Sequence, residues 1–184
     1  SQLAALPPHQ LQAVGGMESI LEDLEIITQS AETILHIKED LIGPVRLAQP
    51  QALNLAELLH EIVAGMALPE GVIQLETAAH LPPAWGDPRQ MANVFSNLIK
   101  NAWEALANTP DPKICVKGRR DDDPNFVLVT VKDNGPGIPK EIQEKIWVSF
   151  FTTKGGSGGT GLGLSSVMQI VNQHDGKIML ESDA

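Results

Sequence analysis

The first strong pattern along the chain is a row of apolar residues spaced alternately four and three positions apart. The row comprises Ile20, Leu24, Ile27, Ala31, Ile34 and Leu41, with Lys38 interrupting it. This spacing is close to the period of about 3.5 residues that joins helices in coiled coils and bundles. We therefore predict one long helix over residues 17–42 that packs against a partner helix; an amphipathic helix lying on a globular core is the alternative. Gly43-Pro44 predicts its end, and residues 1–16, interrupted by Pro and Gly pairs, are predicted to form a loose leader.

From residue 51 onward, short segments of helical and alternating periodicity follow one another. Helices are predicted at residues 55–66, 87–106, 141–146 and 162–173, and strands at residues 72–77, 114–119, 126–132 and 177–181. Asp87 is a favourable N-cap with Pro88 at the first helical position, which makes the start of the second helix well defined. This mixed order predicts an α+β fold, a two-layer α/β sandwich with helices on one face of a mixed sheet, preceded by one long helix.

Composition narrows the classes of protein that this can be. The chain has 184 residues and a formal net charge of −10, which argues against nucleic acid as a partner, since such binding needs a basic surface. Its one cysteine, Cys115, excludes an intrachain disulfide framework and fits a reducing compartment. No run of about 18 apolar residues is present, and the first ten residues do not read as a signal peptide. We therefore expect a cytoplasmic location with no membrane contact in this segment.

The predicted helix at residues 87–106 carries amides where a helix usually carries charges. Asn93, Asn97, Asn101 and Glu104 form one stripe, beside the apolar face that carries Val94 and Leu98. Asn is a poor helix former, so three of them on one stripe weaken the helix with no evident capping role. An amide oxygen suits Mg²⁺ when anionic phosphates supply the other ligands. A metal-binding stripe and a solvated polar face are both compatible with this pattern.

Two segments are rich in glycine: one follows a predicted strand and the other precedes a predicted helix. Asp133-Asn134-Gly135-Pro136-Gly137 comes directly after an apolar strand, where a carboxylate could accept a hydrogen bond from an exocyclic amine such as that of adenine; a simple tight turn is the alternative. Residues 152–163 hold six glycines in twelve positions and a helix follows at once. Such a loop can bind an anion through backbone N–H groups and the helix N-terminus, and Lys154 could pair with a phosphate. A flexible surface loop is the alternative.

Two other nucleotide motifs can be weighed against this interpretation. There is no G-x-x-x-x-G-K-[ST] sequence, which excludes a P-loop. Residues 156–161 do fit G-x-G-x-x-G, the dinucleotide fingerprint, with Glu181 twenty residues further on. However, only 23 residues follow Gly161, and Thr152, Thr153 and Lys154 separate the preceding apolar run from the glycines. A dinucleotide-binding domain is therefore disfavoured.

Four segments in order, NLIKNAWEA, DNGPGI, FFTTK and GTGLGL, resemble the N, G1, F and G2 boxes of sensor histidine kinases. These kinases belong to the GHKL group, whose ATP-binding domains have the Bergerat fold, and the FFTTK wording is most similar to their nitrogen-regulation branch. The resemblance covers about residues 51–182 and implies an ATP-binding catalytic domain at residues 51–184. It also implies that residues 17–50 are part of the dimerisation and phosphotransfer hairpin with its linker.

The resemblance implies a role for each residue of the boxes. It makes Asn101 the Mg²⁺ ligand, places Asn97 beside it near the phosphates, and makes Asn97, Lys100 and Lys154 the candidate catalytic residues, with Lys154 near the γ-phosphate; Glu104 lies in the same box. Asp133 would bind the adenine amino group. The remaining nucleotide-binding positions that it implies are Gly135, Gly137, Ile138, Phe151, Thr153, Gly159, Thr160, Gly161, Leu162 and Gly163, with Phe150 beside Phe151 as an anchor of the lid.

One position separates the kinases of this group from their hydrolytic relatives. The gyrase, mismatch-repair and chaperone ATPases carry a Glu four residues before the Mg²⁺ ligand, and this chain has Asn97 there. An amide cannot accept a proton from water, so phosphoryl transfer to a protein side chain is favoured over hydrolysis. A nucleotide-binding regulatory module without transfer activity and a GHKL-type ATP hydrolase are the alternatives.

The phosphoacceptor box of the family is not recognisable in this chain. His9 is followed by Gln10, with no proline five residues on, and it lies too close to the predicted helix at residues 17–42 to leave room for a full helix before that one. We expect the acceptor histidine on a helix missing from this chain, and the family's last strand beyond Ala184. The expected function is transfer of the ATP γ-phosphoryl to that histidine, for relay to the receiver domain of a response regulator, within a homodimeric full-length kinase.

Overall fold

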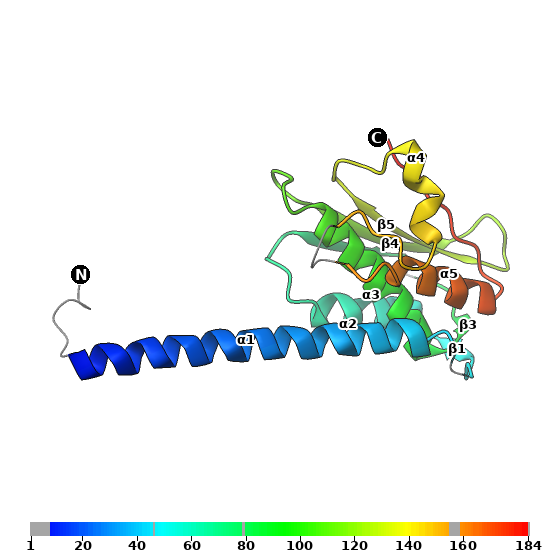
Figure 1. The fold of residues 1–184 in the computed structure, drawn as a ribbon. Helices are drawn as coiled ribbons and strands as arrows, with labels where there is room; N and C mark the ends of the chain where they lie inside the picture. Colours follow the sequence, from blue (N-terminus) through cyan, green and yellow to red (C-terminus); the bar gives the residue numbers. More distant parts are fainter. Residues whose placement is uncertain (1–7, 46, 79, 155–158, 184) are drawn as a thin grey trace. The chain divides into compact units, whose positions relative to one another are not determined.

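The computed structural model describes residues 8–183, apart from 46, 79 and 155–158. The chain divides into two compact units, one ending at Lys38 and one beginning at Glu39. Helix α1 (Pro8–Ile42) makes up the described part of the first unit as far as Lys38, and its last turn belongs to the second unit. The helix is drawn in blue in Figure 1. The helix starts earlier than predicted, so residues 8–16 of the expected leader are helical. Proline fits the first turn of a helix, where its missing N–H has no partner, and glycine weakens a helix without ending it.

The apolar row of α1 is exposed in the single chain. Leu24 is 53% exposed, Ile27 63% and Ile34 66%. The helix that the periodicity predicted is therefore present, and its apolar side chains are accessible. Packing of this side against a partner helix stays a prediction.

The second unit contains a mixed sheet, as predicted. Strand β4 (Ile114–Arg120) is central: β2 (Ile73–Thr77) pairs with it in parallel and β5 (Val127–Asp133) in antiparallel. A separate two-stranded ribbon joins β1 (Gln51–Leu53) to β3 (Ala84–Gly86). Sequence periodicity missed this ribbon because three residues are too few to display alternation.

Helices α2 (Leu55–Gly65) and α3 (Pro88–Ala105) pack on the sheet, and α5 (Gly163–Gln173) packs against α3 (Figure 1). The core lies between these helices and the sheet, with Leu59, Ile99, Val116 and Ile170 fully buried. Alternation along β4 buries Ile114 and Val116 while Lys117 is exposed. Helices on one side of a mixed sheet are the architecture that the sequence predicted.

The last predicted strand is wrong. Among the residues that the structure describes, no strand is found at 177–181, although Ile178 packs against the core and Met179 is 73% exposed. Alternating burial is therefore present without a ladder of backbone hydrogen bonds, and the ladder is what defines a strand. The helix predicted at residues 141–146 is divided into α4 (Lys140–Gln143) and the 3₁₀ turn η2 (Lys145–Trp147).

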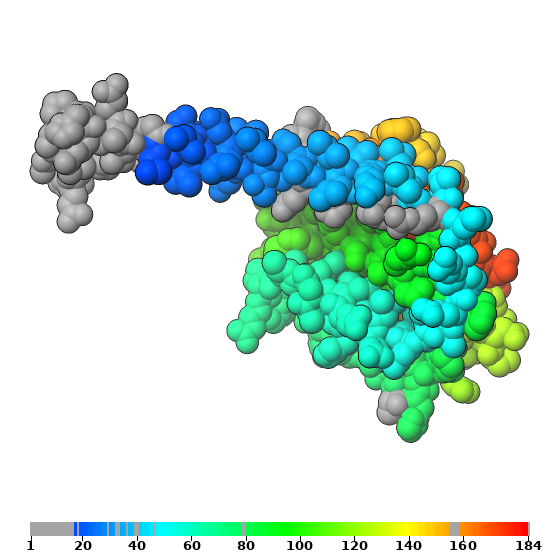
Figure 2. All heavy atoms as spheres, turned by 90° about the horizontal axis from the view of Figure 1, so that it is seen from below, coloured from blue at the N-terminus to red at the C-terminus, as the bar shows by residue number. Residues whose placement is uncertain are grey.

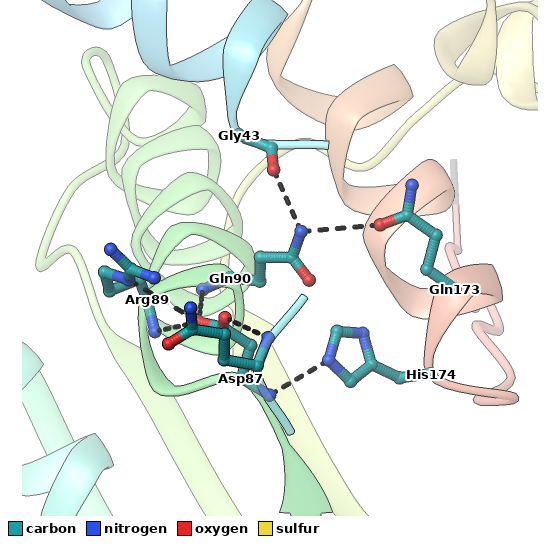
Figure 3. Close-up of polar contacts among 7 residues, drawn as sticks. Gly43, Asp87, Arg89, Gln90, Gln173 and His174 are labelled. Carbon is teal, nitrogen blue, oxygen red and sulfur yellow. Dashed lines mark hydrogen bonds and ion pairs between the residues drawn. The ribbon is translucent and has the colours of Figure 1, made fainter. Parts of the chain in front are cut away.

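Within the second unit, a polar cluster at the start of α3 binds the segment that follows α1 (Figure 3). Gln90 Nε2 donates to the carbonyl of Gly43 at 2.9 Å, and Gln173 Nε2, from α5, donates to the carbonyl of Pro44 at 2.5 Å. The backbone N–H of Gln49 donates to Asp87 Oδ2 at 2.8 Å. In the space-filling view the cyan segment around residues 43–50 lies beside the green start of α3 (Figure 2). Gly43, Pro44 and Gln49 are thus held in place by α3 and α5.

His174 completes this cluster from the C-terminal end of α5. Its Nε2 accepts a hydrogen bond from the backbone N–H of Asp87 at 3.0 Å, and its Nδ1 lies 2.8 Å from the carbonyl of Ile170. This pair of contacts requires the neutral tautomer with the proton on Nδ1. The cluster therefore joins the start of α3 to the end of α5.

Within the part of the chain that the structure describes, no helix combines the length and apolar character that a membrane crossing requires.

Candidate functional site

Helix α3 positions the amide stripe. Asp87 caps its N-terminus by accepting hydrogen bonds from the N–H groups of Arg89 and Gln90, at 2.9 and 3.3 Å. With Ile99 buried on one side, Asn93, Asn97 and Asn101 lie half-buried on another. The helix therefore begins where the sequence predicted and presents its amides along one side.

The amide stripe faces helix α5. Asn97 Nδ2 donates to Asn93 Oδ1 at 3.1 Å, and Ser166 Oγ, from α5, donates to the same oxygen at 3.4 Å. A fully solvated polar face is therefore excluded as the explanation of this stripe. Ser166 was not singled out from the sequence, because a serine inside an amphipathic helix carries no signal of its partner 73 residues away.

The first residue of α5 lies directly against the amides. A Cβ atom added to Gly163 would lie 2.8 Å from Asn97 Oδ1 and 3.9 Å from Asn101 Nδ2. Glycine allows this approach without displacing the Asn97 side chain, and it brings the start of α5 to Asn97 and Asn101. The first N–H groups of a helix have no partner inside it and carry partial positive charge. The N–H groups at the start of α5 and the amide side chains of α3 thus meet at one place.

The glycine-rich loop before α5 is closed at its base. The N–H of Phe150 donates to the carbonyl of Gly161 at 2.8 Å, and Gly161 has a φ of +66°. A Cβ on Gly161 would lie 2.5 Å from the carbonyl carbon of Phe150, so no other residue fits. Phe151 is half-buried, whereas Phe150 is 72% exposed and holds the loop through its backbone rather than its ring.

Other loop residues have local roles. Thr160 Oγ1 accepts a hydrogen bond from the N–H of Leu162 at 3.3 Å, and Leu162 itself is buried. Thr153 is exposed, as is Lys100 on α3. Residues 155–158 of the predicted phosphate loop lie outside the described residues.

Lys154 and Glu104 form an ion pair that brings the loop to α3. Both side chains are partly buried, with 35% of the lysine and 29% of the glutamate exposed. The backbone N–H of Lys154 donates to Thr152 Oγ1 at 3.1 Å, which fixes the turn from which the lysine extends. Sequence reasoning named both residues but did not pair them, because they are 50 positions apart.

The turn after β5 packs against the C-terminal end of α3. Asp133 Oδ1 accepts a hydrogen bond from the N–H of Gly135 at 2.8 Å, and a Cβ on Gly135 would lie 3.7 Å from the carbonyl of Ala105. Gly137 has a φ of +77°, and the N–H of Ile138 donates to Ser182 Oγ at 2.7 Å. The strand register places Asp133 opposite the buried Ile114, on the sheet face that carries the helices. All the predicted segments therefore meet α3.

Asn134 holds this turn in place and was missed as a contributor. Its Oδ1 accepts a hydrogen bond from the N–H of Lys113 at 2.7 Å, and its Nδ2 donates to the carbonyl of Asp111 at 3.0 Å. The DNG string signalled a turn, but the segment to which the turn is tied could not be read from it.

The site offers few metal ligands of its own, so a metal ion here would need ligands from a bound molecule. No group of three or more His, Cys, Asp or Glu side chains that could hold a metal is found among the described residues. The half-buried amide of Asn101 beside the start of α5 provides one neutral oxygen of the kind that Mg²⁺ accepts when phosphates and water supply the rest. These residues therefore fit Mg²⁺ that arrives with a nucleotide.

Comparison with known proteins identifies relatives of the chain. Residues 86–184, slightly more than half of it, match the family described as histidine kinase-, DNA gyrase B- and HSP90-like ATPase. The sensory histidine kinase/phosphatase NtrB of Vibrio alginolyticus is 30% identical over 175 residues, which cover 89% of this chain and 49% of NtrB. Sporulation kinase E of Bacillus subtilis is 31% identical over 74% of this chain and 19% of its own length.

Solved structures of histidine kinases also resemble the chain. The catalytic domain of histidine kinase ThkA superposes with a TM-score of 0.55 at 32% identity, covering 68% of this chain and 82% of that domain. Full-length ShkA in complex with AMPPNP has a TM-score of 0.66 at 19% identity, which shows a shared fold. The chain spans about half the length of the NtrB relative.

Proposed function

This chain belongs to the histidine kinase-, DNA gyrase B- and HSP90-like ATPase family, and from that premise we propose that it binds Mg·ATP and transfers the γ-phosphoryl group to a histidine. The observation that carries this proposal is the contact between Gly163 and Asn97. It brings partly positive N–H groups beside the Asn97 amide oxygen and the Asn101 amide, which is an arrangement suited to a triphosphate with its metal.

Each part of the nucleotide has a partner in this proposal. Asp133 Oδ1 already accepts a hydrogen bond from the N–H of Gly135, and its Oδ2 would accept one from the adenine amino group. The N–H groups at the start of α5 would bind phosphate oxygens, and the Lys154 ammonium would bind the γ-phosphate as a point charge. Asn101 would hold Mg²⁺, which neutralises phosphate charge and orients the γ-phosphoryl group when bound.

The chemistry expected of these residues is positioning and charge neutralisation. The γ-phosphorus would be presented in line to a histidine nitrogen, with Lys154 balancing charge that develops on its oxygens. Asn97 supports transfer over hydrolysis because its amide cannot remove a proton from water. The product expected is therefore phosphohistidine rather than free phosphate.

We also propose how the rest of the chain takes part. The exposed apolar row of α1 supports a role in the dimerisation and phosphotransfer hairpin of a homodimeric kinase. The acceptor histidine would lie on the other helix of that hairpin, and a receiver domain of a response regulator would take the phosphoryl group from it.

Titration calorimetry with Mg·ATP tests the binding part of the proposal. Wild type should bind, and Asn101→Ala should weaken Mg·ATP binding at least about tenfold because a direct metal ligand is lost. The same substitution should have little effect on ATP in the presence of EDTA. Equal affinity of wild type and variant for Mg·ATP would refute the metal role of Asn101.

Transfer is tested by adding a hairpin that carries the acceptor histidine. Wild-type chain with Mg·ATP should yield phosphohistidine on the hairpin, with little phosphate released in its absence. Binding without transfer would favour a regulatory nucleotide-binding module. Steady phosphate release from the chain alone, abolished by Asn97→Ala, would favour an ATP hydrolase.

A further inference from the structure

We propose that Glu104 is a positioning residue that holds the Lys154 ammonium in the nucleotide-free domain and releases it to the γ-phosphate when ATP binds. The inference rests on the proposed function, because it specifies what the site does before the triphosphate arrives. The observation that carries it is the ion pair between the two side chains, which joins the loop before α5 to the last turn of α3.

The position of Glu104 is electrostatically unfavourable for the helix that bears it. It lies in the last turn of α3, where partial negative charge accumulates on free carbonyl groups, and that turn contains no basic residue. A carboxylate at this end opposes the helix dipole. The Lys154 ammonium is the cation that the structure pairs with it. A residue that weakens its own helix and binds a lysine from another segment points to a role outside helix stability.

The pair is placed where exchange with a phosphate is possible. Glu104 follows Asn101 by three residues, so the two side chains lie on the same side of α3, one turn apart. Gly163, the first residue of α5, lies against Asn97 and Asn101 on that side. The ammonium is therefore about one helical turn from the place proposed for the phosphates and the metal.

The loop guides the lysine toward this side of the helix. Its backbone is fixed by Thr152 Oγ1, and a Cβ on Gly159 would lie 3.5 Å from Lys154 Cδ, so the glycine backbone runs along the lysine side chain. A carboxylate and a γ-phosphate in this region compete for one ammonium group. Because the pair is only partly exposed, its attraction is screened less than that of a surface pair.

Competition makes a specific prediction about affinity. Replacing Glu104 by Gln keeps its size but removes the competing charge, so ATP should bind more tightly. This gain should depend on Lys154 and on the γ-phosphate. Simple repulsion between Glu104 and the nucleotide would instead act on both ATP and ADP and would persist without the lysine.

A double-mutant cycle measured by titration calorimetry separates these explanations. Dissociation constants for Mg·ATP and Mg·ADP would be measured for wild type, Glu104→Gln, Lys154→Met and the double variant. Asp122→Asn is the matched control, because it removes the same charge from an exposed turn at the opposite end of β5 from Asp133. Thermal unfolding would establish that every variant is folded.

We expect Glu104→Gln to tighten Mg·ATP binding about three- to tenfold, with less than about a twofold change for Mg·ADP. In the Lys154→Met background the same substitution should change neither, and Asp122→Asn should change neither. An equal gain with and without Lys154, an equal gain for ADP, no gain at all, or weaker ATP binding would each overturn the proposal. If wild type fails to bind Mg·ATP, the proposed function itself fails.

Discussion

Gly163 illustrates at the residue scale how a contact, rather than flexibility, can require a glycine. Its neighbour Gly161 needs a positive φ and an approach to Phe150 that a Cβ would block. Gly163 is the first residue of helix α5 and has no positive φ. A Cβ atom added to it would lie 2.8 Å from Asn97 Oδ1. The two glycines serve different purposes: one closes the base of the loop and the other lets α5 approach the amides of α3.

Gly163→Ala should therefore destabilise the protein and weaken nucleotide binding together. The added methyl group would force Asn97 or α5 to move, at a cost of about 1–3 kcal/mol in the free energy of unfolding. Denaturant unfolding and titration with Mg·ATP would measure the two effects.

Gly65→Ala is the control for this substitution. Nothing lies within 4 Å of the position of its Cβ, at the end of α2. We expect it to leave ATP affinity unchanged and to leave stability unchanged or raise it by up to about 1 kcal/mol. A Gly163→Ala protein as stable and as active in binding as Gly65→Ala would contradict the close approach of α5.

At the scale of elements, the start of α3 depends on one buried carboxylate. Asp87 is 2% exposed and accepts hydrogen bonds from three backbone N–H groups. Burial by itself would raise the pKa of Asp87, but the N–H groups of Gln49, Gln90 and Arg89, with the Arg89 charge, outweigh it and hold the pKa below its ordinary value. The ionised form thus binds α3 and the segment before β1 at once.

The lowered pKa of Asp87 implies a pH-dependent contribution to stability. Because the pKa is lower in the folded than in the unfolded state, the contribution is complete above the unfolded value of about 3.9 and is lost as the pH falls through the folded value. Asp87→Asn keeps a capping oxygen but turns an N–H donor toward Gln49. We expect it to lower the free energy of unfolding at neutral pH by about 1–2 kcal/mol.

Urea unfolding at a series of pH values would measure this difference between wild type and Asp87→Asn. The difference should shrink as the pH falls into the acid range where Asp87 becomes protonated. Asp122→Asn, in an exposed turn, should follow wild type at every pH. A difference that is constant across the acid range would contradict the role of the ionised carboxylate.

At the scale of the whole molecule, the segment between α1 and β1 decides where the unit that carries the proposed nucleotide site begins. The sequence predicted this start at residue 51, and that division stays a prediction. The compact unit of the structure begins at Glu39, and residues 43–49 donate or accept three hydrogen bonds with α3 and α5. Among the described residues, the hydrophobic core cluster of the unit begins at Leu55, and Pro44 is buried outside that cluster. The segment before β1 thus contributes hydrogen bonds and one buried proline.

Two shortened chains distinguish these boundaries. Residues 39–184 should keep the thermal midpoint and Mg·ATP affinity of the whole chain, because the described residues of that unit's core cluster all come after α1. Residues 51–184 should be less stable by about 2 kcal/mol or more, since several net hydrogen bonds are lost and Asp87, Gln90 and Gln173 lose partners. Equal unfolding midpoints for the two shortened chains would show that residues 39–50 add no stability.

Much of the fold followed from local patterns. The N-cap at Asp87, the helical stripe of α3 and the alternation in β4 each act within a few residues, and each predicted its element. The ribbon of β1 and β3 was too short for such a pattern, and residues 177–181 had the pattern without a partner strand. Periodicity reports which side of a segment is buried, whereas a strand also requires a neighbour.

The sequence by itself determined the types of element, the four boxes and the family to which they belong, because motif chemistry and periodicity are properties of neighbouring residues. Tertiary structure decided which boxes touch. It brought Gly163 to Asn97 across 66 positions, paired Lys154 with Glu104, and bound residues 43–49 to the ends of α3 and α5. Such contacts depend on how helices pack over the sheet, and no local pattern encodes the distance between residues that only packing brings together.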